Sequence, residues 1–210
     1  MTCQPSSHHI EQLASLGPEI CRTLTHFEFV HQDIDAWDGK DANKLTDDAA
    51  TRLARMCPRL RVVQLRGAHA SRLTDAAATA FLANCPALTS LEITGENHNV
   101  RHLFLEAFFD ALREHPGWAP KLKTLRIAES GGMSNSRGSW MRAMRTLSRE
   151  RETLLVQLVG LSRVKKRGDL ELVPAEYNFR KGRKFDKWDR CGPSQGPIPR
   201  GRVAKSRAGW

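Results

Sequence analysis

Two cysteines at matching positions are the first residues in this sequence whose type and spacing could do chemistry. Cys57 and Cys85 stand 28 residues apart, and each is followed by a proline. A zinc site is typically built from close ligand pairs such as Cys-x-x-Cys, and the sequence contains none. Because a free cysteine packs like a small hydrophobic residue, we expect Cys57 and Cys85 to be core residues, and we expect no cofactor.

Two other groups have residue types that bind metals. The segment 31–44 carries four aspartates around Gly39, but it lacks the glycine position and the final glutamate of an EF-hand calcium loop. We therefore favour an exposed acidic loop. His98 and His102 would share one face of a helix, but no third ligand is evident, so no metal site is predicted there either.

The sequence shows no pattern of a known active site. Residues 129–140 (ESGGMSNSRGSW) place glycines and serines before an expected helix, as phosphate-binding loops do, but they lack the Gly-Lys-Ser/Thr ending. A long turn is the favoured interpretation. There is also no Gly-x-Ser-x-Gly motif and no carboxylate pair at a catalytic spacing. We expect a protein that is not an enzyme.

The two cysteines belong to a repeated unit. Residues 45–60 (LTDDAATRLARMCPRL) return as LTDAAATAFLANCPAL at 73–88. After each Cys-Pro the chain continues with spaced apolar residues, the last two of which point to one side of a strand. A threonine or aspartate can cap the start of the helix, and the proline prevents the helix from continuing. Each unit is predicted to be strand, turn, helix and turn.

Weaker copies extend the pattern to about five units. Residues 21–29, 121–127 and 153–160 supply apolar residues in the strand frame, and 103–116 and 139–150 supply helices. One such unit cannot bury its own apolar faces, so neighbouring units must cover one another. The pattern predicts an α/β solenoid.

The two central units resemble the cysteine-containing leucine-rich repeat of F-box/leucine-rich-repeat proteins, through the segments CPRLRVVQLRG (57–67) and CPALTSLEITG (85–95) and the helices that begin with LTD. The resemblance covers about residues 21–160. It implies a right-handed leucine-rich-repeat solenoid, a short arc with strands inside, helices outside and the ligand on the concave face. The residues before the first expected strand are too few for a complete F-box.

The chain is predicted to have four parts. They are an N-terminal cap helix at 1–20, the leucine-rich-repeat domain at 21–160, a basic C-terminal cap or tail at 161–190, and a disordered tail at 191–210. No secretory signal and no apolar run long enough for a membrane helix is evident. We expect reduced cysteines, a location in the nucleus or cytoplasm, and no membrane association.

Polar residues between the buried strand positions predict a binding face. They are His26, Glu28, Arg61, Gln64, Arg66, Glu92, Thr94, Lys123 and Arg126. Basic residues outnumber acidic ones on this face, so the expected partner is a protein or an acidic or phosphorylated peptide, which arginine can bind through two parallel hydrogen bonds. The alternative is a solvated strand face that binds nothing.

The net charge of +10 is concentrated near the C-terminus, because residues 161–210 contain 14 basic and five acidic residues. Two basic clusters have the spacing of a bipartite nuclear-localisation signal, which a nuclear import carrier would bind. They are Arg163, Lys165, Lys166 and Arg167, and then Arg180, Lys181, Arg183 and Lys184. We favour a capping role for 161–190, which is compatible with such a signal.

Two hypotheses about function remain open. The first is a non-enzymatic protein-interaction module, for which the resemblance implies substrate recognition beside the subunits of an SCF-like ubiquitin ligase. The alternative is a nuclear protein that associates with nucleic acid through its basic C-terminal tail, where aromatic residues among the charges allow base stacking.

Overall fold

The computed structural model describes residues 7–30, 45–66, 73–94, 106–128, 137–166 and 169–185. Its helices are α1 (Ser7–Ser15), α2 (Pro18–Thr23), α3 (Asp47–Met56), α4 (Asp75–Asn84), α5 (Glu106–Glu114) and α6 (Arg137–Glu150). Its strands are β1 (His26–Val30), β2 (Val62–Arg66), β3 (Ser90–Thr94), β4 (Thr124–Ala128), β5 (Leu155–Lys166), β6 (Asp169–Arg180) and β7 (Arg183–Phe185). The fold is α/β.

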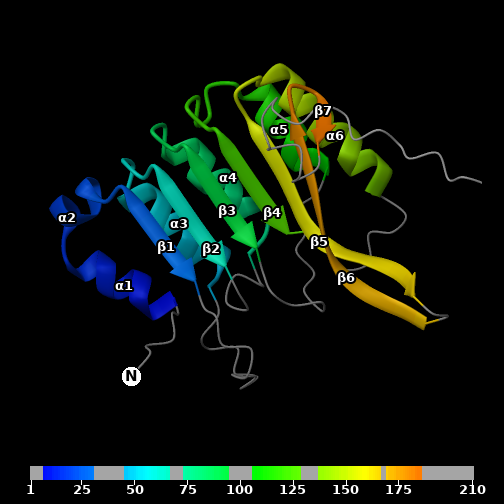
Figure 1. The fold of residues 1–210 in the computed structure, drawn as a ribbon. Coiled ribbons are helices and arrows are strands. Elements are labelled where there is room, and N and C mark those ends of the chain that lie inside the picture. The colour runs from blue at the N-terminus through cyan, green and yellow to red at the C-terminus, as the bar shows by residue number, and fades with distance from the viewer. Residues whose placement is uncertain are drawn as a thin grey trace, which may run out of the picture.

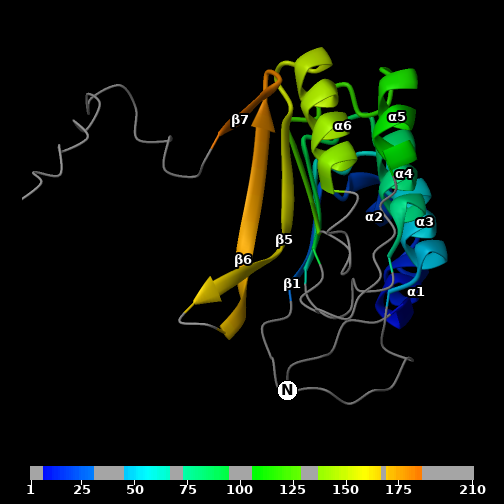
Figure 2. The same cartoon turned by 90° about the vertical axis from the view of Figure 1, so that its right-hand side faces the viewer.

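The seven strands form one mixed sheet in chain order (Figure 1). Strands β1 to β5 are parallel, whereas β6 runs antiparallel to β5, and β7 runs antiparallel to β6. Figure 2 shows the helices on one side of the sheet, so the other side, called the open face below, has no described helix over it. None of the described helices combines the length and the apolar composition that crossing a bilayer requires.

The buried residues of the parallel strands are aligned from strand to strand. One row across the sheet consists of Val63, Leu91, Leu125 and Val156. The next consists of Leu65, Ile93, Ile127 and Leu158. All eight side chains are almost completely buried. This confirms the strand frame predicted from the repeated sequence, and it turns the same side of every strand toward the helices.

A ladder of backbone hydrogen bonds joins the points where the chain enters each parallel strand. The Thr25 carbonyl accepts from the Arg61 amide at 2.7 Å, and the Arg61 carbonyl accepts from the Thr89 amide at 2.8 Å. The Thr89 carbonyl accepts from the Lys123 amide, and the Lys123 carbonyl from the Leu155 amide, each at 2.8 Å. The strands therefore start in line although the units differ in length.

Helices α3 and α4 begin where the sequence predicts. Thr46 and Thr74 are the N-caps of α3 and α4, and the hydroxyl of each accepts a hydrogen bond from a free backbone amide. Asp47 connects the two units, because its carboxylate accepts from the Thr74 amide at 2.8 Å and from the Thr74 hydroxyl at 2.7 Å. Position 47 thus stabilises the following unit as well as its own helix.

The N-terminal segment forms two helices, α1 and α2, where one cap helix is predicted. Gly17 has a φ of 94°, a left-handed conformation that favours glycine, and Pro18 occupies the first turn of α2. The second helix runs to Thr23, so Cys21 lies in a helix and not at the start of the strand segment 21–29. The buried side chain of Cys21 still belongs to the core.

The cysteines lie inside the core, as predicted for Cys57 and Cys85. Both are completely buried, and the Cys85 thiol donates to the carbonyls of Ala54 and Cys57 at 3.6 Å. Burial, with a smaller contribution from the neighbouring Cys21, raises the pKa of Cys57 from 9.0 to about 12. Burial also raises the pKa of Cys85 to about 12. These thiols are therefore protonated and unreactive in the folded protein.

Arg151 fixes α6 against α5. Its guanidinium donates to the carbonyls of Leu112, His115 and Trp118 at 2.8, 3.1 and 3.1 Å. These carbonyls lie at and beyond the end of α5, where carbonyl groups have no backbone amide of the helix to accept a hydrogen bond from. The exposed pair of Arg113 with Glu150, with hydrogen bonds of 3.0 and 2.9 Å, connects the same two helices.

We expect Asp47→Ala to lower the free energy of unfolding by about 2 kcal/mol, because the carboxylate that accepts two hydrogen bonds from Thr74 is removed. Asp48→Ala is the matched control, since Asp48 is exposed one position further along the same helix and should lose about 0.5 kcal/mol at most. Urea denaturation of both variants measures the difference. Equal losses would show that the carboxylate of Asp47 acts only on the dipole of its own helix.

Alkaline pH should destabilise the protein through its buried thiols. Between the unfolded pKa of 9.0 and the folded pKa of about 12, the unfolded chain releases thiol protons that the folded chain retains, so stability falls as pH rises. Each thiol contributes at most about 1.4 kcal/mol per pH unit. The free energy of unfolding of C57A/C85A and of wild type is measured by denaturation between pH 8 and 11. At pH 8 the value for the variant should be lower, but it should fall less steeply than that of wild type as the pH rises. Parallel curves would contradict the assignment.

Candidate binding face

The open face carries a central row of polar residues. The row consists of Glu28, Gln64, Glu92, Arg126, Gln157 and Asn178, one residue from each of the strands β1 to β6. These residues alternate with the buried positions, so the register that places the apolar side chains beneath the helices also places this row on the opposite side. The row is the frame of the candidate site.

Glu92 is the centre of an ion-pair network on this face. Its side chain is 8% exposed, and its carboxylate accepts a hydrogen bond from Arg66 at 2.7 Å. Arg126 lies 3.2 Å from the other oxygen of Glu92 and donates to Glu176 on β6 at 2.8 Å. The Thr94 hydroxyl donates to Glu92 at 3.2 Å. The network spans β2 to β6 and balances two arginines with two glutamates.

This pairing corrects the electrostatic part of the sequence prediction. Arg66 and Arg126 lie on the predicted face, but both are already ion-paired with carboxylates of the same chain. The Nε atoms of both arginines are buried and donate no hydrogen bond within the described residues. A ligand cannot reach these buried atoms, and at the exposed parts of the two guanidinium groups an acidic peptide would compete with Glu92 and Glu176.

Strand β6 adds residues that the sequence prediction missed. Glu176 pairs with Arg126, and the side-chain amide of Gln157 donates to Asn178 at 2.7 Å. Phe179 is completely buried on the helix side. Polar Glu176 and Asn178 alternate with aromatic Tyr177 and Phe179, and this period of two is the signal that could have identified a strand there. The segment predicted to act as a cap supplies β6 and β7.

Part of the open face has polar groups with no side-chain partner among the described residues. Glu28 on β1 is exposed, and Gln64 on β2 is half-buried; neither is paired there. Ser90 and Thr124 present hydroxyl groups in the row next to them. Of the other predicted residues, His26 is exposed at the start of β1, where its Nδ1 lies 2.9 Å from the Thr25 hydroxyl. The strands β1 to β4 thus offer hydrogen-bonding groups that a partner could use.

Two residues of the predicted face are misplaced. Arg61 and Lys123 precede β2 and β4, and both are exposed. They are separated by an even number of positions from the buried Val63 and Leu125, so they are out of phase with the open face. Their backbones belong to the strand-entry ladder. The prediction counted the strand from Leu60, which is buried but precedes β2, so it placed Arg61 and Lys123 inside strands that begin one residue later.

Several other candidates lie outside the described residues. They are the acidic loop 31–44, the pair His98 and His102, and most of the glycine-serine segment 129–140. Among the residues that the structure describes, no three His, Cys, Asp or Glu side chains are grouped so that they could hold a metal ion.

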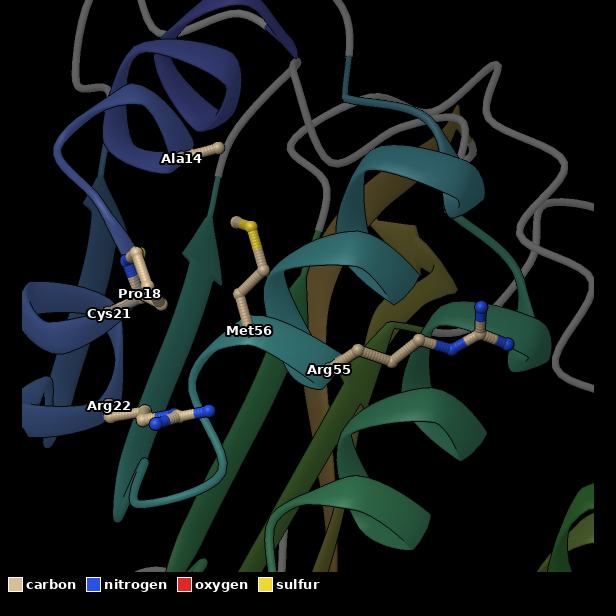
Figure 3. Close-up of a pocket in the computed structure, with 6 residues that line it drawn as sticks. All are labelled: Ala14, Pro18, Cys21, Arg22, Arg55 and Met56. Carbon is tan, nitrogen blue, oxygen red and sulfur yellow. The ribbon is translucent and has the colours of Figure 1, made fainter.

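A small hollow lies between the N-terminal helices and α3 (Figure 3). Its volume is about 240 Å³, and it is lined by Ala14, Pro18, Cys21, Arg22, Arg55 and Met56. Figure 3 shows Met56 reaching from α3 toward Ala14, whereas Arg55 points away along the helix. Small-molecule sites usually enclose about 300 Å³ or more. The hollow is better explained as the imperfect seam between α2 and α3.

The two basic clusters lie at different ends of the β5–β6 hairpin. Arg163, Lys165 and Lys166 stand on β5, beside the end at which Lys166 pairs with Asp169. Arg167 lies outside the described residues. The second cluster, 180–184, occupies the end of β6 and the turn into β7. The structure does not bring the clusters together, and the bipartite localisation signal stays a prediction.

Comparison with protein-family models gives no match for this chain, and comparison with curated proteins gives none either.

We expect Glu92→Gln to lower the free energy of unfolding by about 2 kcal/mol, because Arg66 and Arg126 lose the carboxylate between them. The partial exposure of both arginines limits the loss. Glu28→Gln is the matched control in the same row, where an exposed carboxylate with no described partner should cost about 0.5 kcal/mol at most. Chemical denaturation measures both changes, and a Glu92→Gln protein as stable as wild type would show that the network adds no net stability.

Proposed function

We propose that the chain is a leucine-rich-repeat solenoid of about five units that acts as a non-enzymatic protein-interaction module. The observation that supports this proposal is the open face itself, a row of polar residues on consecutive parallel strands that no described helix covers. Stacked repeats build extended surfaces of this kind for binding. The partner binds across β1 to β4, where Glu28, Gln64, Ser90 and Thr124 have no described side-chain partners.

The chemistry of the face favours a neutral, polar protein surface as the partner. The arginines on this face are already paired with Glu92 and Glu176, so an acidic or phosphorylated peptide would have to compete with these carboxylates. Hydroxyl and amide groups such as those of Gln64 and Thr124 exchange hydrogen bonds with another protein without a large charge. The paired network beside them is preorganised, which reduces the ordering cost of binding.

A role in substrate recognition within an SCF-like ubiquitin ligase pathway, in the nucleus or cytoplasm, is the biological setting that we propose. Its support is the resemblance of residues 45–95 to cysteine-containing leucine-rich repeats, which is an analogy at the level of the fold. In this setting ligase subunits are further partners. Affinity purification from cells should recover a ligase adaptor, and its absence would count against this setting but not against the interaction module.

The open-face variant Q64R/T124R tests the interaction surface. Two long, charged side chains placed among the polar groups should reduce recovery of the bound partners by at least about tenfold, which corresponds to about 1.4 kcal/mol. The control T79R/A83R adds the same charge on the outer side of α4, whose residues Thr79 and Ala83 are at least partly exposed. Quantitative mass spectrometry of affinity-purified complexes compares the two. Partner lists that respond equally to both variants would contradict the assignment of the face.

A further inference from the structure

A basic surface covers α6 and the turn between β6 and β7. It consists of Arg142, Arg145, Arg149, Arg180, Lys181, Arg183 and Lys184, all exposed. The three arginines of α6 are spaced by three and four residues, which places them on one face of the helix. Figures 1 and 2 both show the β6–β7 turn beside α6. Cations from two parts of the chain therefore lie at the same end of the molecule. Lys184 is in phase with buried Phe179 on the helix side, whereas Arg180 and Arg183 are in phase with Asn178 on the other side of the sheet.

The turn is held rigidly against α6. Lys181 and Gly182 have φ values of 51° and 72°, the pattern of a two-residue type I′ hairpin turn. The Gly182 amide donates to the hydroxyl of buried Ser148 at 3.1 Å. A Cβ atom on Gly182 would meet the Arg149 side chain at 3.0 to 3.1 Å, so Arg149 lies directly over the turn. This contact joins the cations of the helix to those of the strands.

The described part of the chain supplies no ion-pair partner for the charges of the basic surface. None of its seven side chains forms an ion pair with any residue that the structure describes. Two acids on the same elements are engaged elsewhere, Glu150 with Arg113 and Glu176 with Arg126. Glu152 is an exposed acid in the loop after α6. Lys184 has an aromatic neighbour, with its Nζ 5.1 Å from the centre of the Tyr177 ring.

Two of the arginines face each other across the hairpin. Arg180 on β6 is the direct register partner of Arg183 on β7. Like charges at directly opposite positions destabilise an antiparallel pair. A bound polyanion removes this repulsion, so the arrangement costs stability in the free protein and is relieved in a complex. The pairing of Arg66 and Arg126 with carboxylates on the open face shows the opposite arrangement in the same chain.

We propose that the basic surface binds the phosphate backbone of double-stranded nucleic acid. Five of its seven cations are arginines, whose planar guanidinium groups bind phosphate oxygens in pairs. An anionic membrane would also need apolar anchors, but the large exposed apolar residues in the described part of the chain are Leu16 and Ile20, at the other end of the sheet. A single strand would need exposed aromatic rings, and Tyr177 is partly buried beneath Lys184.

This surface differs from the one implied by the sequence alone, which assigned nucleic-acid binding to a basic tail. Here the helix α6 supplies three of the cations, and the folded hairpin fixes the other four. The surface also lies apart from the unpaired polar groups of β1 to β4. The inference is therefore independent of the proposed protein-interaction function, and either can fail without the other.

The test uses the full-length protein and a fluorescent 20-base-pair duplex, as DNA and as RNA, in anisotropy titrations from 50 to 200 mM salt. The variant R145Q/R149Q/R183Q/K184Q should bind at least tenfold more weakly than wild type at 100 mM salt. Its plot of log affinity against log salt should be shallower by up to about 0.9 for each phosphate that the variant no longer neutralises. The control R22Q/R52Q/R55Q/R59Q removes the same charge from exposed positions at the opposite end and should stay within threefold of wild type.

Several outcomes would overturn the proposal. Equal weakening of the variant and the control would mean that only net charge matters, and unchanged binding of the variant would place the contacts elsewhere. Tighter binding to single strands or to phosphatidylserine vesicles than to the duplex would assign the surface to another ligand. Self-association of the variant with unchanged duplex binding would mean that the charges only protect the edge strand β7. If the variant fails to fold, R142Q/R145Q on α6 gives the same comparison.

Discussion

The burial of the apolar rows of the parallel strands beneath the helices is the constraint on which the rest of the structure depends. Val63 and Leu65 point toward the helices, and because side chains alternate along a strand, Gln64 and Arg66 must point the other way. The backbone ladder at the strand entries keeps this phase from β1 to β5. A sheet covered by helices on one side has to satisfy the polar groups of its other side without them, which is what the network around Glu92 does.

Two kinds of contact among the described residues help to hold units of different length in register. One is at the strand entry, where Thr25, Arg61, Thr89 and Lys123 repeat the same backbone contact. The other is at the helix start, where Asp47 of one unit binds Thr74 of the next. The connections 31–44 and 67–72 have 14 and six residues, yet each joins a strand to the helix of the following unit. Loop closure becomes only slowly more costly as a connection lengthens.

The sequence predicted the elements that depend on local pattern. The repeated spacing identified the buried rows through Val63 and Leu91 and the burial of the cysteines. It left the N-caps open between a threonine and the following aspartate, and the structure shows Thr46 and Thr74. It could not identify the partners of Arg66 and Arg126, because the pairing depends on which residues meet across three or more strands. The positions of Arg61 and Lys123 were missed for a simpler reason, an error of phase at the strand start. That the sheet belongs to a solenoid and binds a protein is a proposal, which rests on the sequence resemblance and on the open face.

Arginine serves two different purposes in this chain, and its partners distinguish them. On the open face, Arg66 and Arg126 each have a carboxylate within ion-pair distance, so their charges are neutralised within the fold and their main effect is to hold neighbouring strands in place. On α6 and the β6–β7 turn, the arginines face solvent and, at Arg180 and Arg183, one another. Repulsion between like charges does not stabilise the protein when no ligand is bound. It concentrates positive potential at one end of the molecule, where it can attract a polyanion over distances longer than any single contact.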